Sequence, residues 1–309
     1  MSLQVYNQRS FALNATKATN SSAWPYEPLD SKQGLILFLI TLPGTLGNMV
    51  AFITTWKLIK TQVAAPNYLI LALNFTDFYG IAFCTFPTLL CYLNKNWTGG
   101  DIMCNFQGVS TMFASLASGI FASVMATDRL LAIWKPYIYR QHVTVKKTLI
   151  TICATWLIAL FIGLLPLVGV GDFVRNLTGT FCTVNWFAKR PADQAYSIVY
   201  ASIGIVLVVV VVICNIQITV SLFRIKRKRQ EMVSAMRLTD ATSRKTEMQL
   251  VKSVGAISVL FVICWFPFMV GWAYIFRLQY FYLFRNYTHV LKYLTRFAFQ
   301  VVVCYLLVN

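Results

Sequence analysis

Long apolar stretches, separated by short polar connections, dominate the chain from residue 34 onward. The seven stretches fall at residues 34–58, 65–93, 104–134, 148–170, 196–222, 249–276 and 287–308. Each is long enough to cross the ~30 Å hydrocarbon core of a bilayer as a helix. Helices are expected because lipid offers no hydrogen-bond partners to an open backbone. The pattern therefore predicts an all-α membrane protein, a bundle of seven transmembrane helices.

The polar segments predict the orientation of this bundle. Residues 1–33 are expected to form a glycosylated N-terminal segment, and residues 34–309 the seven-helix domain without a cytoplasmic tail. Basic residues follow the first, third and fifth stretches, as in cytosolic connections: Lys57, Lys60, Lys135, Arg140, Lys146, Lys147, Arg224, Lys226, Arg227, Lys228 and Arg229. Acceptor sequons for N-glycosylation occupy the opposite side, at Asn14, Asn20, Asn96, Asn176 and Asn286. We therefore expect a multi-pass protein of the plasma membrane with its N-terminus outside.

Composition agrees with a membrane protein and excludes another class. The chain is 58% hydrophobic and only 12% charged, whereas soluble domains are about 25% charged. Its net charge of +17 could suggest nucleic-acid binding. That function needs basic residues gathered on one soluble face, and here they lie between apolar stretches. No nucleic-acid partner is therefore expected.

Cysteines and histidines limit the chemistry further. Cys104 and Cys182 both fall on the predicted outer side, where they face an oxidising compartment and could pair. The six cysteines inside apolar stretches are interpreted as small packing residues: Cys84, Cys91, Cys153, Cys214, Cys264 and Cys304. The chain has only two histidines and shows no metal-ligand spacing, catalytic triad or cofactor-binding loop. We expect no metal, no cofactor and no enzymatic activity.

Two charged features inside or beside the spans need an explanation, because a charge at bilayer depth is costly, and an aromatic residue beside a proline needs one as well. Asp77 is either a structural acid held by Asn48 and nearby hydroxyls, or an ion- or proton-sensitive switch. The pair Asp128-Arg129 is either a solvated pair at a helix end or a lock that opens toward a cytosolic partner. Trp265 is either a packing residue or, together with the helix-kinking Pro267, part of a hinge that a ligand could move.

The order and spacing of these positions resemble the rhodopsin-like G-protein-coupled receptors. The residues that carry the resemblance are Gly47-Asn48, Asp77, Cys104, Asp128-Arg129, Trp156, Cys182 and Cys264-Trp265-Phe266-Pro267. The resemblance implies a small-molecule agonist outside and a heterotrimeric G protein inside. It also implies roles in activation for Asp77, Asp128, Arg129, Trp265 and Pro267.

Less general segments resemble the prostanoid receptors, and among them the fourth subtype of prostaglandin E receptor. They are Thr76-Asp77-Phe78-Tyr79-Gly80, Ala132 to Tyr139, Thr178-Gly179-Thr180-Phe181-Cys182, Asn185-Trp186 and Arg296 in the seventh stretch. This resemblance implies an E2-like prostaglandin as agonist, a stimulatory G protein and a rise in cyclic AMP. It also implies that Arg296 binds the ligand carboxylate, assisted by hydrogen bonds from Tyr92 and Thr180.

Alternatives to these site residues remain open. Arg296 could instead be an interfacial residue that extends to the lipid headgroups, and Tyr92 could belong to an aromatic belt. A receptor for a different small ligand is a further alternative. Against an amine ligand, Thr111 stands where the amine receptors carry an acid. Against retinal, Phe299 stands at the place of the Schiff-base lysine, and Lys292 lies too close to the outer surface. A transporter would be expected to show internal repeats, which the sequence lacks.

The seventh stretch departs from the family pattern. Receptors of this superfamily carry Asn-Pro or Asp-Pro near the inner end of that helix, and 297–309 contains neither proline nor aspartate. A truncated or non-signalling seven-helix receptor variant is therefore the main alternative function.

Overall fold

The structure is a computed structural model that describes residues 31–61, 63–175, 179–186 and 188–236. Its elements, in chain order, are α2 (Ser31–Thr61), α3 (Ala65–Gly80), the π-helical turn η1 (Ile81–Thr85), α4 (Phe86–Asn94), α5 (Gly100–Trp134), α6 (Pro136–His142), α7 (Val145–Leu164), the 3-10 turn η2 (Leu165–Val168), β1 (Phe173–Arg175), β2 (Cys182–Val184) and α8 (Pro191–Met236). The predicted sixth and seventh helices lie outside the described residues.

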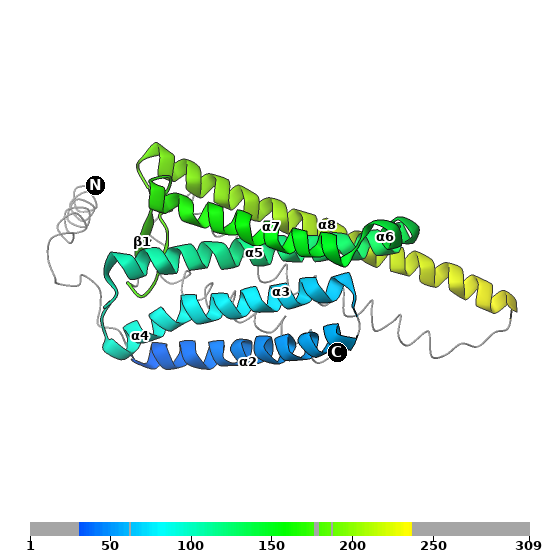
Figure 1. Cartoon of the computed structure of the whole chain (residues 1–309), viewed down its shortest axis with the longest axis horizontal. Helices are drawn as coiled ribbons and strands as arrows, with labels where there is room; N and C mark the ends of the chain where they lie inside the picture. The colour runs from blue at the N-terminus through cyan, green and yellow to red at the C-terminus, as the bar shows by residue number, and fades with distance from the viewer. Residues whose placement is uncertain (1–30, 62, 176–178, 187, 237–309) are drawn as a thin grey trace, which may run out of the picture.

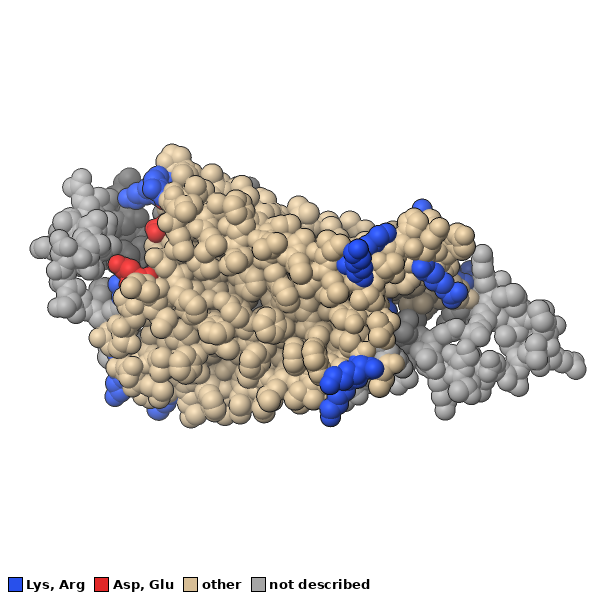
Figure 2. All heavy atoms as spheres, in the orientation of Figure 1, with Lys and Arg blue, Asp and Glu red and all other residues tan. Residues whose placement is uncertain are grey.

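Five helical segments of the described part are long and apolar enough to cross a membrane. They are α2, α3 with η1 and α4, α5, α7 with η2, and the first 35 residues of α8. Figure 1 shows them side by side, with the β1–β2 hairpin at one end of the bundle and α6 at the other. We call these ends the hairpin end and the α6 end. Figure 2 shows charged side chains near both ends and an uncharged band between them, as a membrane-spanning surface requires.

The long helix α5 lies at the centre of the described bundle and packs against α3, α7 and α8. Its buried face contains many small residues, including Gly108, Ala117, Ser118 and Gly119. Small residues allow helices to approach closely in lipid, where packing rather than water exclusion holds them together. A Cβ added at Gly80 of α3 would lie 2.9 Å from the Cβ of Ala114, which shows how close the α3–α5 contact is.

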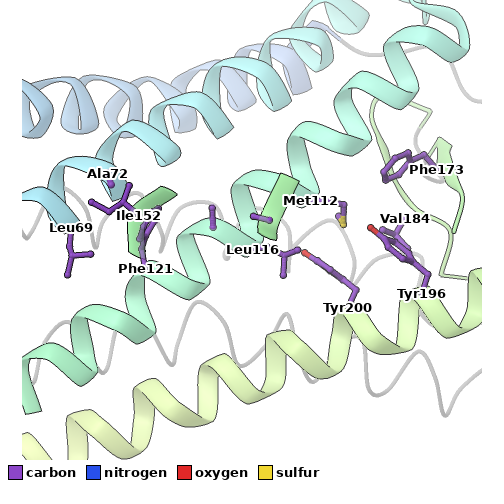
Figure 3. Close-up of a cluster of buried hydrophobic side chains, with 12 residues drawn as sticks. Leu69, Ala72, Met112, Leu116, Phe121, Ile152, Phe173, Val184, Tyr196 and Tyr200 are labelled. Atoms are coloured by element: carbon purple, nitrogen blue, oxygen red, sulfur yellow. The ribbon is translucent and has the colours of Figure 1, made fainter. Parts of the chain in front are cut away.

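Figure 3 shows the main hydrophobic cluster, which α5 shares with its neighbours. Phe121, Leu116 and Met112 of α5 are each at most 2% exposed. The cluster also contains Leu69 and Ala72 of α3, Ile152 and Ala159 of α7, Tyr196 and Tyr200 of α8, and Phe173 and Val184 of the hairpin. One continuous cluster therefore connects the helices to the hairpin.

The structure adds elements that the apolar pattern did not predict. The short helix α6 begins with Pro136, whose fixed φ suits the first helical position. Helix α8 extends beyond the predicted span 196–222 at both ends, and it also begins with a proline, Pro191. One interpretation was wrong: Cys153 is exposed on α7 and is not a buried packing residue. Cysteine is apolar enough to face lipid, so hydropathy alone could not assign its orientation.

Candidate functional site

The hairpin covers one end of the bundle. Its strands are antiparallel, with Phe173 opposite Val184 and Arg175 opposite Cys182. A disulfide joins Cys182 to Cys104 in the first turns of α5, with the two Cα atoms 5.1 Å apart. The predicted pairing of these two cysteines is therefore confirmed. The bond fixes the second strand over the interior of the bundle.

A buried glutamine provides a second attachment for the hairpin. Gln107 of α5 is 1% exposed. Its Oε1 accepts a hydrogen bond of 2.7 Å from the Cys182 N–H. Its Nε2 donates to the Cys84 carbonyl oxygen at 2.8 Å and to Thr88 Oγ1 at 3.0 Å. One side chain thus connects the hairpin to η1 and α4, where Pro87 interrupts the regular helix.

Sequence analysis did not identify Gln107 as important. A signal was present, because an amide inside an apolar stretch is costly unless its hydrogen bonds are made. Its partners, however, lie 19, 23 and 75 residues away in the chain. No local pattern predicts such partners.

Phe173 of β1 lies directly against Gly108 of α5. A Cβ added at Gly108 would come within 2.5 Å of the Phe173 ring. The hairpin can therefore approach α5 only because residue 108 has no side chain. This contact, the disulfide and Gln107 together hold the hairpin in place.

Replacing Gly108 by alanine is expected to displace the hairpin and lower stability by about 1–3 kcal/mol, the usual cost of overpacking. Thermal unfolding of the purified protein in detergent measures the effect. Gly163→Ala is the matched control, since its new methyl group would meet its nearest atom at 3.4 Å, an ordinary contact. Equal melting temperatures for the two variants would contradict the tight Phe173–Gly108 contact.

An ion pair anchors the other side of the hairpin segment. Arg190 donates to both carboxylate oxygens of Asp193, at 2.9 and 2.6 Å, and to the Gly169 carbonyl oxygen at 2.9 Å. Asp193 also accepts from the Gly171 N–H at 3.1 Å. The hydrogen bond to Asp193 raises the pKa of the Arg190 guanidinium. Gly171 has a φ of +105°, so a side chain there would strain the turn that joins η2 to β1.

The structure places two of the three predicted ligand-binding residues near the disulfide. Tyr92 of α4 is 6% exposed and packs in one cluster with Leu37, Cys104 and Cys182. Its Cβ lies 2.6 Å from the position that a Cβ of Gly34 would take, so its ring is held against α2. Thr180, two residues before Cys182, is 2% exposed. Arg296 lies outside the described residues.

Hydroxyl groups and aromatic rings line the interior below the hairpin. The Thr111 hydroxyl donates to the Gln107 carbonyl oxygen at 2.8 Å and to Cys84 Sγ at 3.3 Å. Ser115 of α5 and Tyr200 of α8 form a hydrogen bond of 2.7 Å. None of the residues between 104 and 118 on α5, or between 196 and 211 on α8, carries a charged side chain. In this part of the described bundle, a charged ligand group would find hydrogen bonds but no counter-ion.

Asp77 lies deeper between α3 and α5 and is 4% exposed. Ser118 Oγ donates to its Oδ1 at 2.6 Å, while its Oδ2 has no hydrogen-bond partner among the described residues. Asn48 donates instead to the Gly44 carbonyl oxygen of its own helix. Of the partners expected for a structural acid, the described contacts therefore include a hydroxyl but not Asn48. Trp156 of α7 donates to Thr76 Oγ1 at 2.9 Å and thereby connects α7 to α3, the helix that carries Asp77.

At the α6 end, Asp128 and Arg129 form a loose pair. Arg129 Nε lies 4.0 Å from Asp128 Oδ2, and the Arg129 side chain is 51% exposed. The Tyr139 hydroxyl of α6 donates to Asp128 Oδ2 at 3.3 Å. Burial raises the pKa of Tyr139, as does the neighbouring Asp128 carboxylate, so the phenol stays protonated and can donate. Sequence analysis missed Tyr139, whose contact depends on the helix that begins at Pro136.

The family model described as "7 transmembrane receptor (rhodopsin family)" matches residues 47–309. The chain belongs to this family. The crystal structure of squid rhodopsin supports the fold: it superposes with a TM-score of 0.75 at 18% identity, over 92% of this chain and 78% of that chain. The predicted seven-helix membrane fold is therefore confirmed, and the family is one of receptors rather than enzymes.

The receptor is also similar to curated prostanoid receptors. It is 26% identical to the prostaglandin E2 receptor EP4 subtype of Bos taurus over 259 residues, and this alignment covers 83% of the chain. It is 28% identical over 239 residues to the prostaglandin F2-alpha receptor of Homo sapiens and 24% identical over 237 residues to the prostacyclin receptor of Mus musculus, covering 74% and 75% of this chain. The chain spans 50%, 64% and 57% of the lengths of these relatives. The resemblance to prostanoid receptors agrees with these similarities.

Proposed function

We propose that this chain is a receptor for a lipid carboxylate, an E2-like prostaglandin, in the plasma membrane with its N-terminus outside. The observation that carries the proposal is the similarity to receptors named for prostaglandin E2, prostaglandin F2-alpha and prostacyclin over 74–83% of the chain. The covered interior supports it, because its hydroxyl groups and aromatic rings suit an apolar ligand with few polar groups.

The ligand carboxylate needs a cation, and residues 104–118 of α5 and 196–211 of α8 offer none. Arg296 in the predicted seventh helix would supply it, because a guanidinium can bind a carboxylate through two parallel hydrogen bonds. Tyr92 and Thr180 would add hydrogen bonds from the neighbourhood of the disulfide. Both residues lie where the hairpin, α4 and α5 meet, so the anchor would be positioned at the covered end of the bundle.

Signalling would proceed through a heterotrimeric G protein, with the stimulatory class and a rise in cyclic AMP favoured by the EP4 similarity. Bound agonist would shift the Trp265–Pro267 hinge and move the sixth helix outward. Arg129, already half exposed at the α6 end, would then receive a helix of the G protein. Asp77 would act as a switch between the two states. The agonist must bind the active state more tightly for this shift to occur.

Saturation binding of radiolabelled prostaglandin E2 to membranes tests the ligand class, using cells in which surface staining of an N-terminal tag shows the chain outside. Saturable binding that unlabelled prostaglandin E2 displaces at lower concentration than prostaglandin F2-alpha is expected. Displacement at lower concentration by prostaglandin F2-alpha or a prostacyclin analogue would assign a different ligand of the same class to the receptor. Surface expression without saturable binding of the radiolabelled prostaglandin E2 would reject the proposal of an E2-like ligand.

We expect the Tyr139 hydroxyl to hold Asp128 in the inactive state. Replacing Tyr139 by phenylalanine should therefore raise agonist-independent G-protein activation by roughly twofold to tenfold. The variant removes one hydrogen bond to Asp128, worth about 0.5–1.5 kcal/mol, and leaves the ring in place. Nucleotide exchange on purified stimulatory G protein measures the change. Tyr137→Phe, at an exposed tyrosine on the same short helix, is the control and should leave exchange unchanged. Identical exchange for both variants would show that Tyr139 does not hold Asp128 in the inactive state.

A further inference from the structure

A groove on the surface of α2 combines aromatic rings with two lysines. Phe52, Ile53, Trp56, Lys57 and Lys60 line a groove of about 250 Å³. Each of these residues has another of the set three or four positions away, so the set lies along one side of the helix. The Phe52 and Trp56 rings stack with centroids 6.3 Å apart and planes 11° apart. Lys60 Nζ lies 5.8 Å from the Trp56 ring centroid, within the range of a cation–π contact.

This side of α2 points away from the described bundle. The buried residues Ala51 and Thr55 occupy the opposite side, through which α2 packs on α3. Trp56 is 49% exposed. The described part of the chain therefore leaves this aromatic wall open to a molecule in the surrounding bilayer.

The two lysines lack an acidic partner in the described part of the chain. The ion pairs found there are Asp128–Arg129 and Arg190–Asp193. Asp128 is the acidic side chain described at this end of the bundle, and it faces Tyr139 and Arg129. The positive charge of Lys57 and Lys60 is thus uncompensated by the described residues.

The groove also lies at a defined depth. The apolar part of α2 ends at Trp56, and the lysines follow within the last turns of the helix. Tryptophan rings and lysines collect at the boundary between hydrocarbon and headgroups. A phospholipid bound there would bring its phosphate to the height of the ammonium groups and its glycerol and first acyl carbons to the height of the rings.

We propose that this groove binds the headgroup of an anionic phospholipid. The lipid phosphate lies between the Lys57 and Lys60 ammonium groups, and the upper part of an acyl chain packs on the Phe52–Trp56 wall. Uncompensated positive charge favours an anionic over a zwitterionic headgroup. The stacked Phe52 and Trp56 rings, with the Lys60 ammonium over the Trp56 ring, distinguish this site from the other basic positions described at the same end of the bundle.

The test uses the full chain purified in nanodiscs of phosphatidylcholine with a minor fraction of phosphatidylserine. Phosphatidylserine retained per receptor after mild detergent washing is measured by mass spectrometry. The double variant Lys57→Gln and Lys60→Gln is expected to retain at most about one fifth of the phosphatidylserine that the wild-type chain retains. Trp56→Leu, which keeps both charges, is expected to retain roughly twofold to fivefold less.

Lys146→Gln with Lys147→Gln is the matched control, because it removes two exposed charges at the same end of the bundle, at positions without a described ring contact. Retention close to wild type is expected. An equal fall in both double variants, or no fall with Trp56→Leu, would mean general attraction to a basic surface and overturn the site. Photo-cross-linking of the wild-type chain with a photoreactive phosphatidylserine gives an independent result: labelling is expected at residues 52–60, and labelling confined to other peptides overturns the proposal.

Discussion

Affinity for radiolabelled prostaglandin E2 is expected to fall about 100- to 10,000-fold when Arg296 is replaced by alanine. Two charge-assisted hydrogen bonds would be lost, each worth about 1.5–3 kcal/mol, and each 1.4 kcal/mol changes affinity tenfold. Residues 104–118 of α5 and 196–211 of α8 offer hydroxyl groups but no cation, so they could not replace the guanidinium. Saturation binding at matched surface expression measures the loss.

Lys292→Ala is the control for this experiment. Lys292 is another basic residue of the predicted seventh helix, closer to its outer end. Its removal should change affinity by less than about threefold, as expected of a peripheral charge. Unchanged affinity in Arg296→Ala would reject the carboxylate anchor. It would leave the ligand class open, since that class is tested by binding to the wild-type chain.

The free energy of unfolding is expected to fall by about 1–4 kcal/mol when Gln107 is replaced by methionine. The side chains are similar in length, but methionine leaves the Cys182 N–H, the Cys84 carbonyl oxygen and the Thr88 hydroxyl without their hydrogen bonds to residue 107. Each buried group left unsatisfied costs about 1–3 kcal/mol. Thr88 also donates to the Cys84 carbonyl oxygen at 3.2 Å, which limits the total. Unfolding in detergent, followed by tryptophan fluorescence, measures the change without any ligand.

Asn105→Met is the matched control, because it replaces an exposed amide two residues earlier on the same helix. Its melting temperature should stay close to that of the wild-type chain. The disulfide should also persist in Gln107→Met, since the Cys104–Cys182 bond does not depend on the amide. Similar stability of the two variants would show that Gln107 does not hold the hairpin on η1 and α4.

The sequence by itself determined the class of the protein and much of its topology. In a bilayer, each span must satisfy its own backbone and present apolar side chains, so spans are local properties of the sequence. The family and its fold followed from positions such as Asp77, Asp128-Arg129 and Trp156, whose spacing along these spans is fixed. The disulfide between Cys104 and Cys182 could also be predicted, because these cysteines occur outside the apolar stretches or at their outer limit.

Only the tertiary structure decided how each helix is rotated and what its polar side chains contact. Lipid-facing and core-facing residues are both apolar in a membrane, so hydropathy does not separate Cys153, which is exposed, from Cys214, which is buried. Gln107 and Tyr139 gained their roles from partners on other elements, α4, the hairpin and the end of α5. The groove at Trp56 likewise depends on which side of α2 packs against α3. These features arise from contacts between segments distant in the chain, and the local pattern does not encode such contacts.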